Sequence, residues 1–346
     1  MKSVLQILPK LPPSISGVGD YALILARGLR DQHGWMTTFA VKHPNPEQTE
    51  IEGFSVVPLS FQLADCSEPC LARFDRVLLH YVGYGFQKRG CPCWLLQTVS
   101  SWKSQSPEHR LVTMFHELYA SGPPWRSSFW THPIQRWICG NIARLSGEIV
   151  SNREEGAAIL KRMSSRGLVV NLPVFSTVGE PVEVPSFVER KPWLIIFGSA
   201  EWRRTALTRD REALETACRL GKIERILEIG GGGSATVDGL SVERLGRLDA
   251  PDVSEWLSQC RYGFISYRSS YLEKSTIFAA YASHGVVPVL AEGMIEKRTR
   301  GVEEGKHFLA AGAVAGNEAV IAREVHDWYQ GHRCAELTRV MNDLLE

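Results

Sequence analysis

At 346 residues the chain exceeds the usual length of one domain, so we expect two domains of roughly 150 to 190 residues each. Its 39 basic residues nearly balance its 38 acidic residues, and the formal charge of +1 gives no general reason to expect a nucleic-acid partner. No apolar run approaches the about 18 residues that a transmembrane helix needs, which argues against a membrane-spanning protein and leaves peripheral membrane contact open.

Eight cysteines in a chain that is 44% hydrophobic indicate reduced thiols, so we expect a cytoplasmic protein. The apolar run at the N-terminus is too short for a secretory signal. Two close pairs, Cys66 with Cys70 and Cys91 with Cys93, could each supply half of a zinc site. A zinc finger needs two such pairs at a set distance along the chain. Neither of these pairs has a partner at that distance, so we expect no metal site.

Short apolar segments that alternate with helical segments predict a parallel, doubly wound sheet in the first half of the chain. It begins with a strand at 4–8, a loop rich in Pro and Gly at 9–19, and a helix at 21–29 whose N-cap would be Asp20. The other expected strands lie at 38–41, 54–58, 77–80, 111–115 and 148–151, and the other expected helices at 92–101 and 154–163.

The segment 176–192 contains three prolines and no helical period, which predicts a linker. A second sheet follows, with expected strands at 193–197, 225–229, 242–245 and 262–266, and with helices at 209–220 and 253–260. We therefore expect an N-terminal domain at 1–175, the linker at 176–192, a C-terminal domain at 193–325 and a terminal helical segment at 326–346 that can pack back on the N-terminal domain.

One stretch near the C-terminus has the pattern of a phosphate site. An apolar strand leads into a loop that carries Glu273 and Lys274, and Ser275 and Thr276 open a helix that Gly285 closes before a second apolar strand. Free amides at a helix start and a nearby ammonium both favour an anion, and open α/β sheets bind ligands at the carboxyl ends of their strands. The alternative is an ordinary βαβ connection with a surface lysine.

Four stretches together resemble the GT-B glycosyltransferases, most closely those of the glycosyltransferase family 4 type. They are Pro12 to Tyr21, Phe115 to Tyr119, Phe197 to Ser199, and Lys274 to Val289, and their order covers most of the chain. The resemblance implies an α/β fold of two Rossmann-like domains that face each other across a cleft. It also implies that the C-terminal domain binds a nucleotide sugar without a metal or another cofactor, and the sequence contains no Asp-x-Asp motif.

On this resemblance the donor contacts come from Gly198, Arg203 or Arg204, Lys274, Ser275 and Thr276. The two arginines could instead form a solvated run beside Glu201, Asp210 and Glu212. Glu273 stands where the first of the family's two glutamates would fall, but Ala280 and Tyr281 stand where the second would be. This departure leaves open the identity of the donor and the stereochemistry of the transfer.

In the N-terminal half, Gly17 and Gly19 would let backbone amides approach a ligand. Asp20 either caps the helix or acts as the base that deprotonates an acceptor hydroxyl. His116 follows an apolar strand, so it either hydrogen-bonds the transferred sugar and moves a proton, or has a purely structural role. Glu117 is its neighbour in sequence, although adjacent strand residues point to opposite faces.

Five of the ten tryptophans fall between Trp94 and Trp137, and we expect core packing for most of them. Trp125 and Arg126 follow Gly122-Pro123-Pro124, and with Tyr119 they are the candidates for acceptor binding. Gly230 begins a run of four glycines that fits a dinucleotide fingerprint poorly, because no helix follows; in a GT-B enzyme it would border the nucleotide base.

The sequence therefore predicts a metal-independent glycosyltransferase, hexosyltransferase-like, that moves a sugar from a nucleotide donor to a hydroxyl acceptor. Two alternatives stay open: a GT-B-like nucleotide-sugar epimerase, and a protein that binds a sugar nucleotide without catalysis. The spacing of these residues resolves neither the nucleobase nor the acceptor nor the oligomeric state.

Overall fold

The structure is a computed structural model that describes residues 2–14, 16–45, 47–59, 71–164, 168–231, 235–296, 301–314 and 316–346. The pair Cys66 and Cys70 lies outside the described residues, as does most of the glycine run after Gly231. The chain forms two compact units: Met1–Pro173 together with Cys334–Glu346, and Val174–Arg333. The residues 176–192, expected to form a linker, belong to the second unit, and the last 13 residues belong to the first.

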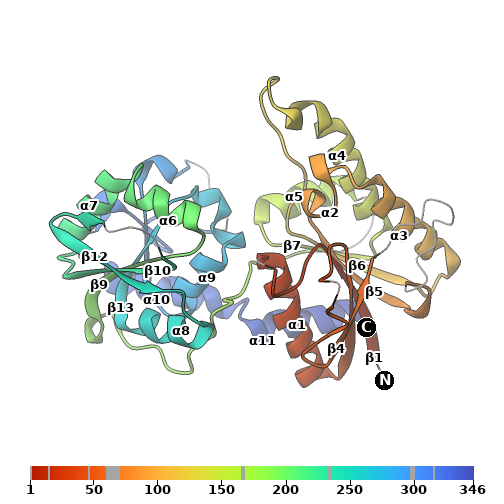
Figure 1. Cartoon of the computed structure of the whole chain (residues 1–346), viewed down its shortest axis with the longest axis horizontal. Helices are drawn as coiled ribbons and strands as arrows, with labels where there is room; N and C mark the ends of the chain where they lie inside the picture. The colour runs from red at the N-terminus through yellow and green to blue at the C-terminus, as the bar shows by residue number, and fades with distance from the viewer. Residues whose placement is uncertain are drawn as a thin grey trace. The chain divides into compact units, whose positions relative to one another are not determined.

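The first unit is built on a sheet with the strand order β3-β4-β2-β1-β5-β6-β7-β8, in which every pairing but β3 with β4 is parallel (Figure 1). Its strands are β1 Lys2–Leu8, β2 Trp35–Val41, β3 Glu50–Ile51, β4 Phe54–Pro58, β5 Arg76–Tyr81, β6 Arg110–Phe115, β7 Glu148–Ser151 and β8 Leu168–Asn171. Its helices are α1 Gly17–His33, α2 Gly83–Phe86, α3 Cys93–Gln105, α4 Ser127–Leu145, α5 Glu154–Met163 and α11 Cys334–Leu345.

Apolar residues of the central strands form the core of the first unit, and the helices cover them. Leu5, Val77, Leu79 and Leu111 are fully buried, as a parallel sheet covered on both faces requires. Helices α1 and α11 pack against each other, while α3, α4 and α5 pack in succession. Gly28 permits the contact between α1 and α11, because a Cβ atom there would lie 2.5 Å from Oγ1 of Thr338.

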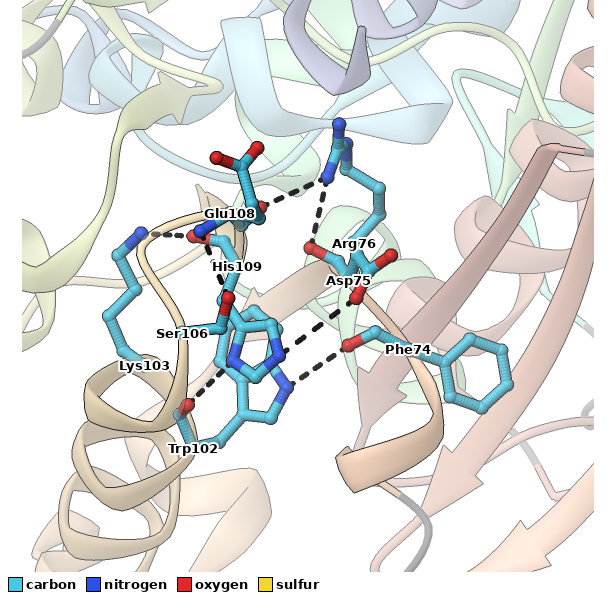
Figure 2. A network of polar contacts seen from close by, with 8 residues as sticks. All are labelled: Phe74, Asp75, Arg76, Trp102, Lys103, Ser106, Glu108 and His109. Carbon is cyan, nitrogen blue, oxygen red and sulfur yellow. Dashed lines mark hydrogen bonds and ion pairs between the residues drawn. The ribbon is translucent and has the colours of Figure 1, made fainter.

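A polar network holds α3 to the amino ends of β5 and β6 (Figure 2), and its Arg76 also bonds the end of α11. The rings of Trp102 and His109 stack with centroids 4.5 Å apart, and Nδ1 of His109 lies 2.7 Å from the carbonyl oxygen of Trp102. Arg76 donates to the carbonyl oxygen of Glu108 at 3.1 Å and to that of Leu345 at 2.9 Å. This network therefore ties the C-terminal helix to the sheet of the first unit.

The second unit has a sheet with the order β11-β12-β10-β9-β13-β14-β15, in which only β11 and β12 pair antiparallel. Its strands are β9 Lys191–Phe197, β10 Arg225–Ile229, β11 Thr236–Val237, β12 Leu240–Gly246, β13 Cys260–Ile265, β14 Val287–Leu290 and β15 Leu309–Ala310. Its helices are α6 Ala200–Leu207, α7 Arg211–Leu220, α8 Ala250–Gln259, α9 Thr276–Ser283 and α10 Glu318–Gln330, with a 3₁₀ segment η4 at Ser269–Lys274.

The segment before β9 is packed against its own unit through Arg190. This side chain is 3% exposed, and its guanidinium donates to the carbonyl oxygens of Pro185, Leu257, Cys260 and His284. Burial lowers the pKa of Arg190 to about 10. The four carbonyl acceptors explain why this segment joins the second unit.

Several elements differ from the sequence expectation. Helix α1 begins at Gly17 rather than at 21, and its N-cap is Ser16, whose hydroxyl accepts from the amide of Gly19 at 3.2 Å. The prediction of Asp20 as N-cap is therefore wrong, and Asp20 lies inside the first turn. Helices α4 and α6 were not predicted. For α4 the reason is that it contains Pro133 and places large apolar side chains on its exposed face.

We expect the second unit to lose stability in mild acid because of His284. Its Nδ1 lies 2.8 Å from the carbonyl oxygen of Ala280 and its Nε2 lies 2.7 Å from Oγ of Ser254, and burial lowers its pKa from 6.5 to about 4. Between these values the unfolded chain binds a proton that the folded chain does not, so the free energy of unfolding falls by about 2 kcal/mol on acidification to about pH 5.

Urea denaturation of the wild type, His284→Gln and His43→Gln across this pH range measures the effect. The His284→Gln variant should show a weaker pH dependence, whereas replacing the exposed His43 should leave the wild-type slope. Equal slopes for all three proteins would show that His284 does not titrate between the two states as described.

Candidate functional site

The second unit places its predicted site at the point where the strand order reverses. From β9 the chain proceeds to β10 and β12 on one side, and then returns to β13, β14 and β15 on the other. The loops after β9 and β13 therefore leave adjacent parallel strands in opposite directions at their carboxyl ends. This is the topological switch point at which open α/β sheets bind ligands.

Two helices begin at this switch point. Helix α6 follows β9 and is capped by Ser199, which accepts from the amide of Trp202, and α9 is capped by Ser275, which accepts from the amide of Phe278 at 3.1 Å. The hydroxyl of Tyr267 also bonds Oγ of Ser275. The predicted donor residue Ser275 therefore serves as the cap of α9, and Thr276 is the half-buried first residue of that helix.

Gly198 brings the two helix starts together. Its φ angle of +123° is one that side-chain-bearing residues rarely adopt, and a Cβ atom there would lie only 2.3 Å from Cδ1 of Ile277. Trp202 and Tyr267 pack edge to face beside this contact, with ring centroids 5.2 Å apart. The residue type at 198 is thus explained by the close approach of β9 to α9.

Lys274 and Glu273 end the η4 segment that leads into α9. The Lys274 side chain is half-buried, and its Nζ lies 4.8 Å from the centroid of the Tyr271 ring. Glu273 is 4% exposed, its carbonyl oxygen accepts from the amide of Val174 at 2.9 Å, and its carboxylate lies against Gly301, where a Cβ atom would be 2.4 Å from Oε1. Lys274 thus directly precedes the cap of α9 in the chain, and its ammonium lies against the Tyr271 ring, whereas the Glu273 carboxylate is buried.

Arg203 and Arg204 have different environments, and the alternative of a solvated run does not hold for Arg203, which is buried. Arg203 is 7% exposed and forms an ion pair with Glu228 at 2.8 Å, while Glu228 also pairs with Arg244 at 2.5 Å. Arg203 further donates to the carbonyl oxygens of Gly198 and Gly231. Arg204 is exposed on α6.

Gly230 is explained by the same arginine. Its φ angle is +134°, and a Cβ atom there would lie 2.4 Å from Cζ of Arg203. The space beside Gly230 is therefore occupied by the guanidinium of Arg203. Gly232 and Gly233 lie outside the described residues. The sequence pointed to Arg203 but gave no sign of its partners Glu228 and Arg244.

The position of the missing second glutamate is filled by buried residues. Ala280 and Tyr281 are fully buried on α9, and the Tyr281 hydroxyl donates to the carbonyl oxygens of Ile195 at 3.0 Å and Phe264 at 3.4 Å. Gly263 accommodates the ring, because a Cβ atom there would lie 2.4 Å from it. Tyr281 thus joins α9 to β9 and β13.

In the first unit the strand order reverses between β1 and β5, and the first turn of α1, which follows the loop after β1, carries Gly17, Gly19 and Asp20. Gly19 is required by packing, since a Cβ atom there would lie 2.6 Å from the carbonyl oxygen of Lys10, whereas no atom lies within 4 Å of the corresponding position at Gly17. Asp20 is half-buried, and burial raises the pKa of its carboxyl group.

His116, at the carboxyl end of β6, belongs to a chain of buried polar side chains. Its Nε2 lies 3.1 Å from Nδ1 of His80 on β5, and Nε2 of His80 lies 2.9 Å from Oε1 of Gln6 on β1. Gln6 in turn donates through Nε2 to Thr37 at 3.4 Å. Burial, and then the adjacent His116, hold the pKa of His80 well below its usual value.

The edge of the Tyr21 ring packs against His116, with centroids 5.3 Å apart. Sequence reasoning singled out His116 and missed Gln6 and His80. The only sequence signal for these two was the occurrence of polar residues inside apolar strands.

The predicted acceptor residues lie on the loop after β6 and at the start of α4. Tyr119 is half-buried and packs edge to face on His132, whose Nδ1 lies 2.9 Å from the carbonyl oxygen of Ala120. Trp125 is 83% exposed, and Arg126 is exposed beside it. Core packing was expected for most tryptophans of this region, but Trp130 and Trp137 are also exposed.

A cavity of about 790 Å³ lies elsewhere in the second unit, between residues 180–188 and α10, and none of the predicted donor residues lines it. Within the described part of the chain, no three His, Cys, Asp or Glu side chains are grouped closely enough to hold a metal ion. The helices of that same part include none that is long and apolar enough to cross a membrane.

Neither a protein-family model nor a curated protein sequence matches the chain. Solved structures do match it along nearly its whole length. An alpha-glucosyltransferase in complex with UDP-glucose and DNA containing an abasic site has a TM-score of 0.58 at 11% identity, with 100% of both chains covered. The fold is GT-B.

Two further GT-B structures are similar. A structure described as trehalose-6-phosphate from E. coli bound with UDP-2-fluoro glucose has a TM-score of 0.59 at 10% identity, covering 100% of this chain and 99% of that one. WaaG, a glycosyltransferase involved in lipopolysaccharide biosynthesis, has a TM-score of 0.51 at 9% identity, with 99% of both chains covered. At these identities the likeness establishes the architecture alone.

The Gly198–Ile277 contact makes a prediction about stability. Gly198→Ala should lower the free energy of unfolding by more than the about 1–3 kcal/mol expected for an unfavourable φ angle, because the new Cβ atom would overlap Ile277. Gly231→Ala is the matched control, since its φ angle is +109° and no atom lies within 4 Å of the added carbon. If chemical denaturation showed equal losses for both variants, the contact would not explain the glycine.

Proposed function

We propose that the protein is a metal-independent glycosyltransferase, similar to the family 4 type, which transfers a hexose from a nucleotide donor to a hydroxyl acceptor. The observation that carries the proposal is the switch point of the second unit, where two capped helix starts lie together and Lys274 directly precedes the cap of α9 in the chain. The similar structures with bound UDP or UDP-sugar support a nucleotide sugar as the donor.

In the proposed reaction the bond between the anomeric carbon and the diphosphate oxygen breaks, and the acceptor oxygen forms a bond to that carbon. The diphosphate leaves with the electron pair, and the acceptor hydroxyl loses its proton. The free amides at the start of α9 and the cation of Lys274 would stabilise the charge that develops on the leaving group. In a site from which water is excluded, one such cation contributes several kcal/mol, roughly as a metal ion would.

The other donor residues have separate proposed roles. Arg204 is exposed on α6 and would bind a phosphate oxygen, whereas the guanidinium of Arg203, held by Glu228, would keep the loop after β9 in place. The buried carboxylate of Glu273 would accept hydrogen bonds from sugar hydroxyls. In the first unit the backbone at Gly17 could be approached closely by a ligand, because the described residues leave open space where a side chain would be.

His116 is the proposed proton acceptor, and His80 is a positioning residue that selects its tautomer. Because Gln6 donates to Thr37 through Nε2, its Oε1 accepts from Nε2–H of His80. Nδ1 of the neutral His80 then accepts from Nε2–H of His116. In this order of hydrogen bonds Nδ1 of His116 carries the lone pair and can take a proton from a hydroxyl group.

A ligand screen tests the proposed donor directly. UDP, GDP, ADP and their sugars are added in a thermal-shift assay, and the binding nucleotide should raise the melting temperature, since a ligand at about 100 times its Kd adds about 2.7 kcal/mol. Product analysis with and without sugar, lipid-linked and DNA acceptors then separates transfer from epimerisation, which needs no acceptor. Failure of every nucleotide to bind would overturn the proposed function.

Lys274→Ala should lower turnover at saturating donor at least about tenfold, because it removes a cation from the leaving group. The matched control is Lys306→Ala, which removes an exposed lysine of the same unit and should retain wild-type turnover. Steady-state kinetics with the nucleotide sugar found in the screen measures both. Unchanged turnover in Lys274→Ala would rule out the role of this cation.

The effect of replacing His80 on turnover should depend on whether the new side chain still offers a hydrogen-bond acceptor to His116. His80→Asn places an amide oxygen near the position of Nδ1 and should retain most activity, whereas His80→Leu should lower kcat about tenfold or more with little change in the donor KM. Because His80 is fully buried, melting temperatures must accompany the kinetics.

Nitrogen NMR of the wild-type protein labelled on histidine reads the tautomer without any assay of activity, and His116→Gln assigns the signal. Protonated Nε2 with unprotonated Nδ1 on His116 is expected. The opposite tautomer would contradict the proposed order of hydrogen bonds, even if the protein proved to be a glycosyltransferase.

A further inference from the structure

Helix α4 and the residue before its N-cap present a row of large apolar side chains to solvent. Trp125 is 83% exposed, Phe129 43%, Trp130 71%, Ile134 47% and Trp137 58%. We refer to these five residues as the aromatic face. Isolated exposed apolar side chains are ordinary, but a contiguous group of this kind on one short segment marks an interaction surface.

The helix itself does not need these side chains for folding. Its opposite face buries Ile138, Cys139 and Ile142 in the core of the first unit. Phe129, Trp130, Ile134 and Trp137 follow the spacing of one helical stripe, so they lie together on the outer side. In Figure 1 the start of α4 projects away from the sheet of its unit, which makes the aromatic face a protrusion.

The preceding loop supports this surface. The indole nitrogen of Trp130 donates to the carbonyl oxygen of Pro124 at 2.9 Å, and the edge of its ring packs against Phe129 with centroids 5.3 Å apart. The amide of Arg126 donates to the carbonyl oxygen of Pro123 at 2.9 Å. The aromatic side chains are thus held in place with their rings at the surface, which lowers the entropy lost when they bind.

The charged residues of α4 and of its flanking segments have a single sign. No Asp or Glu occurs between Glu117 and Glu148, a stretch that includes the whole of α4. The same stretch carries Arg126, Arg136 and Arg144, all of them exposed. In a chain whose total charge is nearly zero, this segregation makes the surface of α4 locally cationic.

We propose that the aromatic face docks on the surface of an anionic lipid bilayer. Tryptophan and phenylalanine insert at the boundary between headgroups and acyl chains, and arginines at the margin bind lipid phosphates. The cationic character argues against a second copy of the same surface, because two such faces would repel each other. A convex helix suits a bilayer, into which it can sink, better than it suits a preformed groove.

This inference is independent of the proposed transfer reaction, and its test needs no donor or acceptor. The full-length protein is sedimented with vesicles of phosphatidylcholine alone and of phosphatidylcholine with phosphatidylglycerol. The wild type should bind the anionic vesicles at least tenfold more strongly than the neutral ones, and added salt should weaken the binding.

In the double variant Trp130→Ser/Trp137→Ser the partition coefficient for the anionic vesicles should fall at least tenfold. The variant Arg136→Glu should no longer prefer anionic over neutral lipid. Val182→Ser/Val188→Ser is the matched control, because both valines are highly exposed but lie in the second unit, and it should bind as the wild type does. Binding of the tryptophan variant at wild-type strength would overturn the proposal. Absence of binding to either vesicle would also overturn it, as would concentration-dependent dimerisation that the tryptophan variant abolishes.

Discussion

The close packing of Gly198 against Ile277 is the constraint on which the geometry of the second unit depends. It brings the end of β9 to the start of α9, so two helix starts that are 76 residues apart in sequence become neighbours. Each helix start offers free amides, and each is closed by a serine rather than by an acidic cap. An anion that binds here meets the partial positive charge of both helix starts, although the first turn of α6 also carries Glu201.

The buried ion pairs beside this contact add rigidity rather than binding capacity. Glu228 receives Arg203 from one side and Arg244 from the other, so one carboxylate is shared by two guanidinium groups. The desolvation of three charges offsets much of their attraction, and such a network contributes little net stability compared with apolar residues. Its effect is geometric, because Arg203 also holds the carbonyl oxygens of Gly198 and Gly231 and thereby orders both loops next to β9 and β10.

Local patterns predicted much of the fold, whereas the site depended on contacts over long distances. The predicted strand at 148–151 matches β7, and the predicted helix at 154–163 matches α5. The helix predicted after Ser275 begins where α9 begins. Each of these elements is a short segment with clear end signals in the sequence. Helix α4 was not predicted because its sequence contains Pro133 and because its outer face is apolar, so the usual helical pattern is hidden. The chain of Gln6, His80 and His116 required the registers of β1 with β5 and of β5 with β6, which no local pattern contains.

The buried histidines and the aromatic helix are connected through the loop between β6 and α4. His116 follows β6 directly, and the segment that continues from it carries Tyr119 and Trp125 before α4 begins. Gln135 of α4 accepts from the amide of Ala120 at 2.8 Å, so the loop between the histidine and the helix is fixed at its middle. A molecule held at the aromatic face would therefore lie at the far end of the same ordered segment that presents His116. If the acceptor is carried by a lipid, the proposed membrane surface and the proposed proton acceptor are joined by about ten residues of one loop.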